Sequence, residues 1–404
     1  MKVLLFTFSL LFAGIVSSQQ IQHEHELNPH DDDQQVEVCD TRIADPIEYQ
    51  QFETSITQHQ RSATSECTTI RTVVHVIYNG KIANTSFNGY ITPEQVKSQI
   101  RITNQSFSND SLMYHPDNTP LGYNIELATT DPDGNPTTGI VYHDGYELWG
   151  EAWSDYGLKY SNPNAVSEGT VANALAWGAD ANGKKYLNTY VVSSIDGASG
   201  SGVQAYAYFP TLSVVYGNYV IFNAFGARDL QNDYGQTFNL KSYTNLGFTW
   251  THELLHNFGI FHTFQGNSCA TETNPNTQGD RVADTPPQTQ GTGCSGACGT
   301  LSYNIMDYIS QSCKNQITPG QVTRATAAIQ QNLTAYLVCS ESESPSGCPD
   351  KTSDFNGDGF VNILDIAYFI TGFGSIEGNT KYKAKFDLNC DGRIDIFDLL
   401  LIDF

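Results

Sequence analysis

The chain has 404 residues, with 43 acidic against 20 basic side chains and a formal net charge of -23. So acidic a chain is repelled by the phosphates of nucleic acids and anionic lipids, which excludes both as partners and favours divalent cations. Hydrophobic residues make up 39% of the chain, enough for a folded core, and the length suits two or three structural units.

The first 18 residues, MKVLLFTFSLLFAGIVSS, place a lysine before an apolar run and serines after it. This order is typical of a secretory signal peptide, and the apolar run is too short to span a membrane. We therefore expect a signal over residues 1–18 and a secreted, extracellular protein without a membrane span. Residues 19–62 are polar and acidic, which predicts a leader or propeptide, and Arg61 offers a processing point.

The first long apolar run, TTIRTVVHVIY (68–78), is rich in β-branched residues and predicts a buried strand. We expect His75 within it to be a core histidine, not a metal ligand. A helix is predicted in ITPEQVKSQIRITNQSF (91–107), because Thr92 is a good N-cap and a proline follows it. Further strands, predicted between turn residues at 122–130, 185–195, 203–210 and 218–225, indicate an α/β fold.

The composition of the chain changes after residue 262. Residues 263–316 are rich in Gly, Thr, Pro, Asn and Cys with little periodicity, which predicts irregular structure tied by disulfides. Residues 318–338 predict a closing helix, and SESESPSG (340–347) has the composition of a linker. The chain holds nine cysteines, and because nine is odd, one thiol needs another explanation.

The most informative stretch is HELLHNFGIFH (252–262). In a helix, His252 and His256 lie four residues apart on one face, where two imidazoles can bind one metal ion. Glu253 lies beside such an ion, where it can polarise a bound water. Gly259 ends the helix with a left-handed turn, so that His262 can return as a third ligand.

Three imidazoles leave the fourth position of a tetrahedral Zn²⁺ open, as in catalytic sites. Water bound there has a pKa lowered to about 7, which supplies a nucleophile near neutral pH. Glu253 would take its proton and pass it to the departing amine. The spacing therefore predicts one catalytic zinc and the hydrolysis of peptide bonds in protein or peptide substrates.

The zinc motif together with YNIMDY (303–308) resembles the metzincin endopeptidases. Flanking segments at 262–264, 281–287 and 312–321 resemble the pappalysin, or cytophagalysin-like, family within that clan. The resemblance implies an α/β (α+β) catalytic domain over residues 63–339, with a mixed twisted sheet, a zinc helix and an irregular, disulfide-tied lower half. It also implies that Met306 forms an apolar floor beneath the zinc and that Tyr308 stabilises the reacting carbonyl. The strand at 203–210 resembles the edge strand that pairs with substrate.

The same resemblance bears on four cysteines and two acids of the irregular half. It implies a disulfide between Cys269 and Cys294 and another between Cys298 and Cys313, although spacing alone cannot establish connectivity. Asp280 and Asp284 are candidate ligands for a further calcium in the catalytic domain; the alternative is that they cap turns. Cleavage specificity and the natural substrate do not follow from the sequence.

Cys39 lies in the leader and has two interpretations. Zymogens of this clan can place a propeptide thiolate on the zinc, and such a cysteine switch would explain the odd cysteine count. Asp40 stands where a glycine usually follows that cysteine. The alternative is a disulfide between Cys39 and Cys67.

The C-terminal part, residues 348–404, repeats one pattern: DFNGDGFVNILD (354–365) and DLNCDGRIDIFD (387–398). Calcium loops need oxygens at positions 1, 3, 5, 7, 9 and 12 around a glycine at position 6, and both copies satisfy this rule. The two predicted calcium ions are bound by Asp354, Asn356, Asp358, Phe360, Asn362 and Asp365, and by Asp387, Asn389, Asp391, Arg393, Asp395 and Asp398, with Phe360 and Arg393 contributing backbone carbonyls.

With aspartate at position 12 and no entering helix, these repeats resemble a type I dockerin, which implies a small all-α calcium-binding domain and a cohesin-like or cell-surface partner. The combined prediction is a secreted zinc endopeptidase, made as a zymogen, with a calcium-binding docking module. The alternative is a catalytically inactive calcium-binding adhesin or scaffold protein that retains the fold.

Overall fold

The computed structural model describes most of the chain between residues 38 and 402. The described ranges are 38–42, 46–57, 67–84, 86–109, 115–211, 217–295, 297–299, 303–339, 353, 355–356, 361–376, 379–388, 392–395, 398–399 and 402. The predicted signal peptide, Arg61 and the linker at 340–347 lie outside these ranges, so they stay predictions. Among the described residues, no helix has the length and apolarity needed to cross a membrane.

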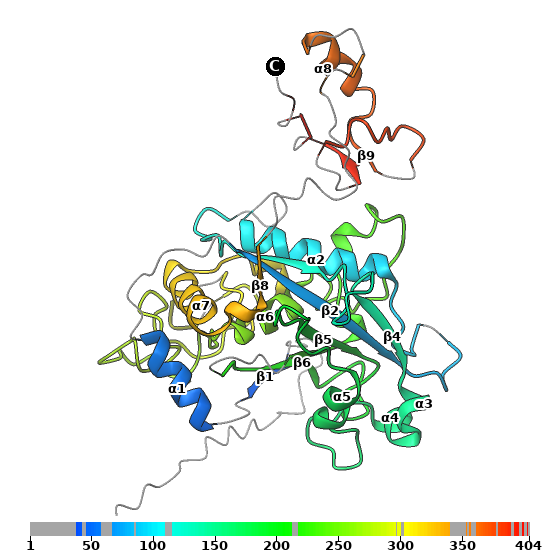
Figure 1. Ribbon diagram of the computed structural model, residues 1–404. Coiled ribbons are helices and arrows are strands. Elements are labelled where there is room, and N and C mark those ends of the chain that lie inside the picture. The colour runs from blue at the N-terminus through cyan, green and yellow to red at the C-terminus, as the bar shows by residue number, and fades with distance from the viewer. Residues whose placement is uncertain are drawn as a thin grey trace, which may run out of the picture. The chain divides into compact units, whose positions relative to one another are not determined.

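A mixed eight-stranded sheet forms the framework of the larger part (Figure 1). Strand β2 is central: β3, β4 and β5 pair with it in parallel, and β8 pairs with its first residues in antiparallel fashion. Beyond β5 follow β7, the antiparallel β6 and finally β1. The strands are β1 (Val38–Arg42), β2 (Thr69–Tyr78), β3 (Asn124–Leu127), β4 (Ile140–Asp144), β5 (Leu187–Val192), β6 (Val203–Tyr208), β7 (Asn218–Ile221) and β8 (Leu337–Val338).

The sequence explains why β2 is central. Strands of parallel sheets are buried on both faces and therefore read as continuous hydrophobic runs. Val73, Val74, Val76 and Ile77 are all fully buried. His75 lies among them, with its ring nitrogens 3.0 Å from the Asn188 side-chain oxygen and 3.2 Å from His143, and burial lowers its pKa to about 4. It is the predicted core histidine.

Aromatic rings form a row across the sheet. The rings of His75 and Tyr190 stack at 5.1 Å, those of Tyr190 and Tyr219 at 4.9 Å, and those of Tyr219 and Tyr206 at 5.0 Å. These residues come from β2, β5, β7 and β6, so the row joins four neighbouring strands. Cross-strand ring pairs of this kind stabilise a sheet and fix its register.

Helices pack on this sheet. The predicted helix at 91–107 is α2 (Pro93–Ser108); the Thr92 side chain accepts a hydrogen bond from the Gln95 backbone, as expected for its N-cap. Helix α2 contacts β3 and the zinc-motif helix α6 (Phe248–Asn257), which in turn packs on β6 and β7. The others are α1 (Pro46–Thr57), α3 (Gly145–Trp149), α4 (Glu151–Tyr156), α5 (Glu168–Leu175) and α7 (Pro319–Asn332), with short 3-10 turns at 222–224, 228–230, 297–299, 311–313 and 334–336.

Three disulfides join six of the described cysteines, and the pairing in the irregular half differs from the family-based expectation. Cys269 pairs with Cys298, and Cys294 pairs with Cys313. The Ser310 amide donates to the Gly293 carbonyl at 2.6 Å, which holds the segment of Cys294 against that of Cys313. Tertiary contacts, not order along the chain, therefore set the connectivity.

The third disulfide joins Cys67 to Cys339 and overturns the alternative of a Cys39–Cys67 bond. Its reason is the pairing of β2 with β8, in which Thr69 lies opposite Val338. Residues just outside that short ladder are brought together, so the bond ties the start of β2 to the end of β8.

The C-terminal domain contains more than the helices expected of it. Helix α8 (Ile363–Phe369) packs on a small core, and β9 (Ser375–Ile376) pairs with β10 (Arg393–Ile394) in antiparallel fashion. The core consists of Phe355, Phe369, Phe386, Ile394 and Ile402.

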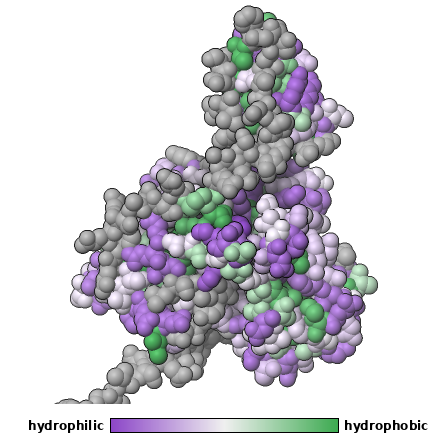
Figure 2. Space-filling model, viewed as in Figure 1, coloured by the Kyte–Doolittle hydropathy of each residue, from purple (hydrophilic) through white to green (hydrophobic). Residues whose placement is uncertain are grey.

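On the face shown in Figure 2, hydrophilic residues cover much of the coloured surface between small hydrophobic patches.

Replacing Cys67 and Cys339 together by serine should lower the free energy of unfolding by about 2–5 kcal/mol, because a long loop regains its freedom in the unfolded chain. Chemical denaturation of oxidised protein measures this change. Replacing Cys269 and Cys298 instead should have a smaller effect, since that bond spans 29 residues and not 272. Equal midpoints for both double variants would contradict this account.

Candidate active site

Helix α6 is held in place by a chain of buried amides. The Trp250 ring N–H donates to the Asn218 oxygen at 2.7 Å, and the Asn218 amide donates to Asn257 at 3.0 Å. Asn257 in turn donates to the backbone carbonyl of Tyr208 at 3.0 Å. Every residue of α6 is buried. Because buried polar groups need partners, this chain fixes the helix against β6 and β7.

The helix ends as its sequence predicts. Gly259 has φ +82°, a left-handed conformation that costs glycine little. Its amide donates to the His256 carbonyl at 2.9 Å, and the Ile260 amide reaches back to Leu255 at 3.0 Å. This turn reverses the chain and returns His262 to the end of the helix.

The three predicted zinc ligands meet. The Nε2 atoms of His252 and His256 lie 3.0 Å apart, and each lies 3.1 Å from Nε2 of His262. Nδ1 of His252 is 2.8 Å from the Ile305 carbonyl, and Nδ1 of His256 is 2.6 Å from the Ile260 carbonyl. A carbonyl can only accept, so Nδ1 carries the proton in both rings and Nε2 keeps its lone pair.

Burial keeps the imidazoles of His252 and His256 neutral. It lowers the pKa of His256 to about 3 and the pKa of His252 well below its ordinary value, where neighbouring His256, Lys314 and His262 lower it further. Neutral imidazole is the form that binds metals. Lone pairs of buried nitrogens that face one another need a cation between them, and the spacing suits Zn–N bonds of about 2.0–2.1 Å. Within the described ranges, this is the one cluster of at least three His, Cys, Asp or Glu ligand atoms.

The other predicted site residues surround this cluster. Glu253 is fully buried on α6 beside His252. Met306 is also fully buried, and its carbonyl accepts from the Thr263 amide, next to His262, at 3.2 Å. The ring centre of Tyr308 lies 4.9 Å from that of His262 and 6.0 Å from that of His252.

Sequence reasoning missed Asp307, which shapes the turn between Met306 and Tyr308. One of its carboxylate oxygens accepts from the amides of Gly291 and Tyr308 at 3.0 and 2.7 Å. The other accepts from the Gln288 side chain at 3.2 Å. Burial raises the pKa of Asp307, and these hydrogen bonds oppose the rise. An acid between Met306 and Tyr308, both predicted site residues, was the signal that could have revealed it.

Asp280 and Asp284 make different hydrogen bonds. Asp284 accepts hydrogen bonds of 2.8 Å from the Thr318 hydroxyl and the Gly320 amide, so it caps the start of α7. Asp280 accepts from the Val282 amide at 3.0 Å, and burial raises its pKa to about 7. The described contacts match the turn-capping alternative for Asp284.

In the C-terminal repeats, the carboxylate predicted at position 12 closes each loop. Asp365 accepts from the amides of Phe355, Asn356 and Asn362 at 2.8, 3.1 and 2.9 Å. Asp398 accepts from the amides of Leu388 and Asp395 at 2.6 and 2.8 Å. The predicted ligands that lie outside the described residues are Asp354, Asp358, Phe360, Asn389 and Asp391.

Comparison with known proteins places both parts of the chain. Residues 170–330 match the family model described as pregnancy-associated plasma protein-A, a peptidase family, and residues 352–403 match the dockerin type I domain. An extracellular metalloprotease of Verticillium alfalfae is 31% identical over 282 residues, which cover 66% of this chain and 80% of that protein. One from Colletotrichum graminicola is 30% identical over 275 residues, covering 65% and 76%.

A solved structure shares the fold. Promirolysin from Tannerella forsythia, in a mutant form, superposes with a TM-score of 0.50 at 24% sequence identity. The match covers 72% of this chain and 92% of that one. At this identity the likeness shows the fold alone.

Changing His256 to alanine should reduce zinc affinity by more than about 100-fold, because even the outer partners of ligands contribute 10–100-fold. Elemental analysis after dialysis should then find about one zinc per chain in the unchanged protein and almost none in the variant. His115→Ala removes a histidine outside the cluster and should keep the metal. Full zinc content in His256→Ala would contradict the three-histidine site.

Proposed function

Because the chain belongs to the metalloprotease family of pregnancy-associated plasma protein-A and carries a dockerin type I domain, we propose that this extracellular metalloprotease is a zinc endopeptidase made as a zymogen. The observation that carries the proposal is the convergence of three imidazole nitrogens beside the buried Glu253. Its domains would be a signal (1–18), a leader (19–62), the catalytic domain (63–339), a linker (340–347) and the dockerin-like domain (348–404).

The proposed chemistry uses the described side chains in distinct roles. His252, His256 and His262 would hold the zinc, which when bound acts as a Lewis acid and lowers the pKa of water to about 7. Glu253 accepts a proton from the attacking water and donates it to the leaving amine. Tyr308 donates a hydrogen bond from its hydroxyl to the oxygen on which negative charge develops. Met306 packs beneath the histidines and preserves their arrangement.

The leader supports the proposed zymogen. Strand β1 runs parallel to β6, with Cys39 opposite Ala205 and Arg42 opposite Tyr208. Strand β6 is the edge strand expected to pair with an extended substrate. A leader strand that uses the same backbone groups excludes substrate from them. The Cys39 side chain lies outside the described part of the chain, so the cysteine switch stays part of the proposal.

The C-terminal domain would bind two calcium ions and attach the enzyme to a cohesin-like or cell-surface partner. Support comes from the dockerin type I match and from the loops closed by Asp365 and Asp398. Carboxylates placed so by backbone amides keep a fixed position, which suits a calcium site. The proposed role is docking or anchoring of the catalytic domain.

Glu253→Ala should lower the rate of casein cleavage by about 10²–10⁴-fold, because a general base is lost while the histidines remain. Zinc content should be unchanged, and a chelator should abolish the activity of the unchanged enzyme. Glu147→Ala removes an exposed acid from α3 and should leave the activity intact. A processed, zinc-loaded protein that cuts no polypeptide would favour the scaffold alternative.

Asp365→Ala should reduce the number of bound calcium ions by one, because the carboxylate that closes the first loop is lost. Titration calorimetry with calcium measures the stoichiometry. Asp398→Ala should remove the other ion, and changing both residues should remove two. Asp229→Ala, at an exposed 3-10 turn of the catalytic domain, is the matched control. Unchanged stoichiometry in the double variant would contradict calcium binding by these loops.

A further inference from the structure

The leader contacts the catalytic domain at a second place besides the β1–β6 ladder. Helix α1, three residues after β1, lies beside α7 (Figure 1). Its apolar side, Tyr49, Phe52 and Ile56, is buried in a cluster whose members from the catalytic domain are Phe209, Phe261, Ala327 and Ala328. We call these four residues, together with Arg281 and Arg324, the α1 face.

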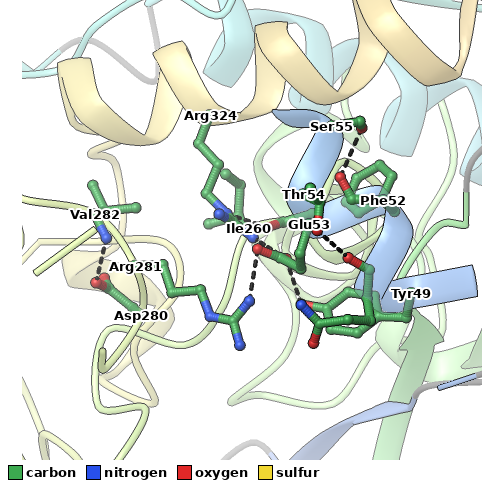
Figure 3. A network of polar contacts seen from close by, with 12 residues as sticks. Tyr49, Phe52, Glu53, Thr54, Ser55, Ile260, Asp280, Arg281, Val282 and Arg324 are labelled. Carbon is green, nitrogen blue, oxygen red and sulfur yellow. Dashed lines mark hydrogen bonds and ion pairs between the residues drawn. The ribbon is translucent and has the colours of Figure 1, made fainter. Parts of the chain in front are cut away.

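A buried carboxylate lies at the centre of this contact. Glu53 is only 3% exposed, and one of its oxygens lies 2.7 Å from the guanidinium of Arg281. The other accepts hydrogen bonds from Arg324 of α7 and from the hydroxyl of Tyr49, one turn earlier on α1. Figure 3 shows both guanidinium groups directed at this carboxylate. A buried charge is stable only when it is paired in this way.

The α1 face is built to receive that charge. The guanidinium carbons of Arg281 and Arg324 lie 5.1 and 5.3 Å from the ring centre of Phe261, and cation–π contacts of this kind orient both groups. Arg324 also donates through Nε to the Gly259 carbonyl at 2.7 Å. Gly259 lies in the turn between His256 and His262. This hydrogen bond therefore holds the Arg324 side chain to the catalytic domain independently of the leader.

The two arginines keep the Glu53 carboxylate charged over a wide pH range. Burial alone raises the pKa of Glu53, but Arg324 and Arg281, together with the hydrogen bond from Tyr49, bring it below its ordinary value. The same burial and the nearby Glu53 raise the pKa of Tyr49, so this hydroxyl keeps the proton that it donates. Neither group changes its charge near neutral pH.

We propose that the α1 face is a binding site for the leader helix as a separate chain, so that the leader stays bound and inhibitory after the polypeptide is cut between residues 57 and 67. This inference rests on the proposed zymogen. The ligand is an acidic, amphipathic helix that offers aromatic rings at Tyr49 and Phe52 and a carboxylate at Glu53. Such a cut breaks neither the β1–β6 ladder nor the α1 contact.

The two contacts reinforce each other. Residues 43–45 are all that separate β1 from α1, so binding of either element holds the other at a high effective concentration. Backbone pairing alone would suit many extended peptides, whereas the buried carboxylate and rings recognise this particular leader. Activation would therefore need dissociation of the leader or a further cut within it.

A site-specific protease sequence in place of residues 58–66 of the full chain tests this inference. After cleavage, the leader fragment should co-elute with the rest of the protein, and hydrolysis of a short peptide should stay low until dilution releases the fragment. In Glu53→Gln, the fragment should dissociate about thirtyfold or more readily, because the arginines lose their charged partner. Glu48→Gln changes an exposed acid of the same helix and should behave like the unchanged protein.

A second measurement does not depend on how the variant chain folds. A labelled synthetic peptide of residues 38–57 should bind the cut, leader-free protein in fluorescence anisotropy, and its Glu53→Gln version should bind about thirtyfold or more weakly. Equal binding of the two peptides, or equal loss of both leader fragments, would overturn the inference. A leader-free protein that binds the peptide through Glu53 yet cuts no substrate would instead overturn the proposed activity and support the site.

Discussion

The architecture depends on keeping three imidazoles buried and facing one another. Their Nε2 atoms lie 3.0–3.1 Å from one another, and all three side chains are buried. Such nitrogens repel one another unless a cation lies between them, so the surroundings must hold the rings rigidly. Backbone carbonyls of Ile305 and Ile260 do this by accepting the Nδ1 protons of His252 and His256.

Segments far apart in the sequence share this task. Ile305 belongs to the irregular half, whereas Ile260 belongs to the turn after α6, so the site forms only when both halves of the domain are folded. Asp307 draws Gly291 and the turn at 306–308 together through buried hydrogen bonds. The amide chain from Trp250 to Tyr208 fixes the helix on the sheet. The disulfides Cys269–Cys298 and Cys294–Cys313 tie further segments of the irregular half together.

The proposed leader contacts two elements that also contribute to the histidine site, β6 and Arg324. Strand β6 presents the edge on which substrate would pair, and β1 covers it. Arg324 connects Glu53 of the leader to the carbonyl of Gly259, within the turn that positions His262. One guanidinium thus contributes both to the geometry of the histidines and to the binding of the leader. In the proposed zymogen, this single buried side chain would link latency to zinc binding.

Local sequence determined the elements whose signals lie within one turn or strand. The spacing of His252, His256 and His262, the glycine between them and the Thr92 cap all act over a few residues, so they could be read directly. Tertiary structure alone decided which cysteines pair, the buried role of Asp307, and the contact of Glu53 with two arginines more than 200 residues away. These depend on distances between segments, which the order of residues does not specify, because burial and partner choice arise only once the sheet and helices have packed.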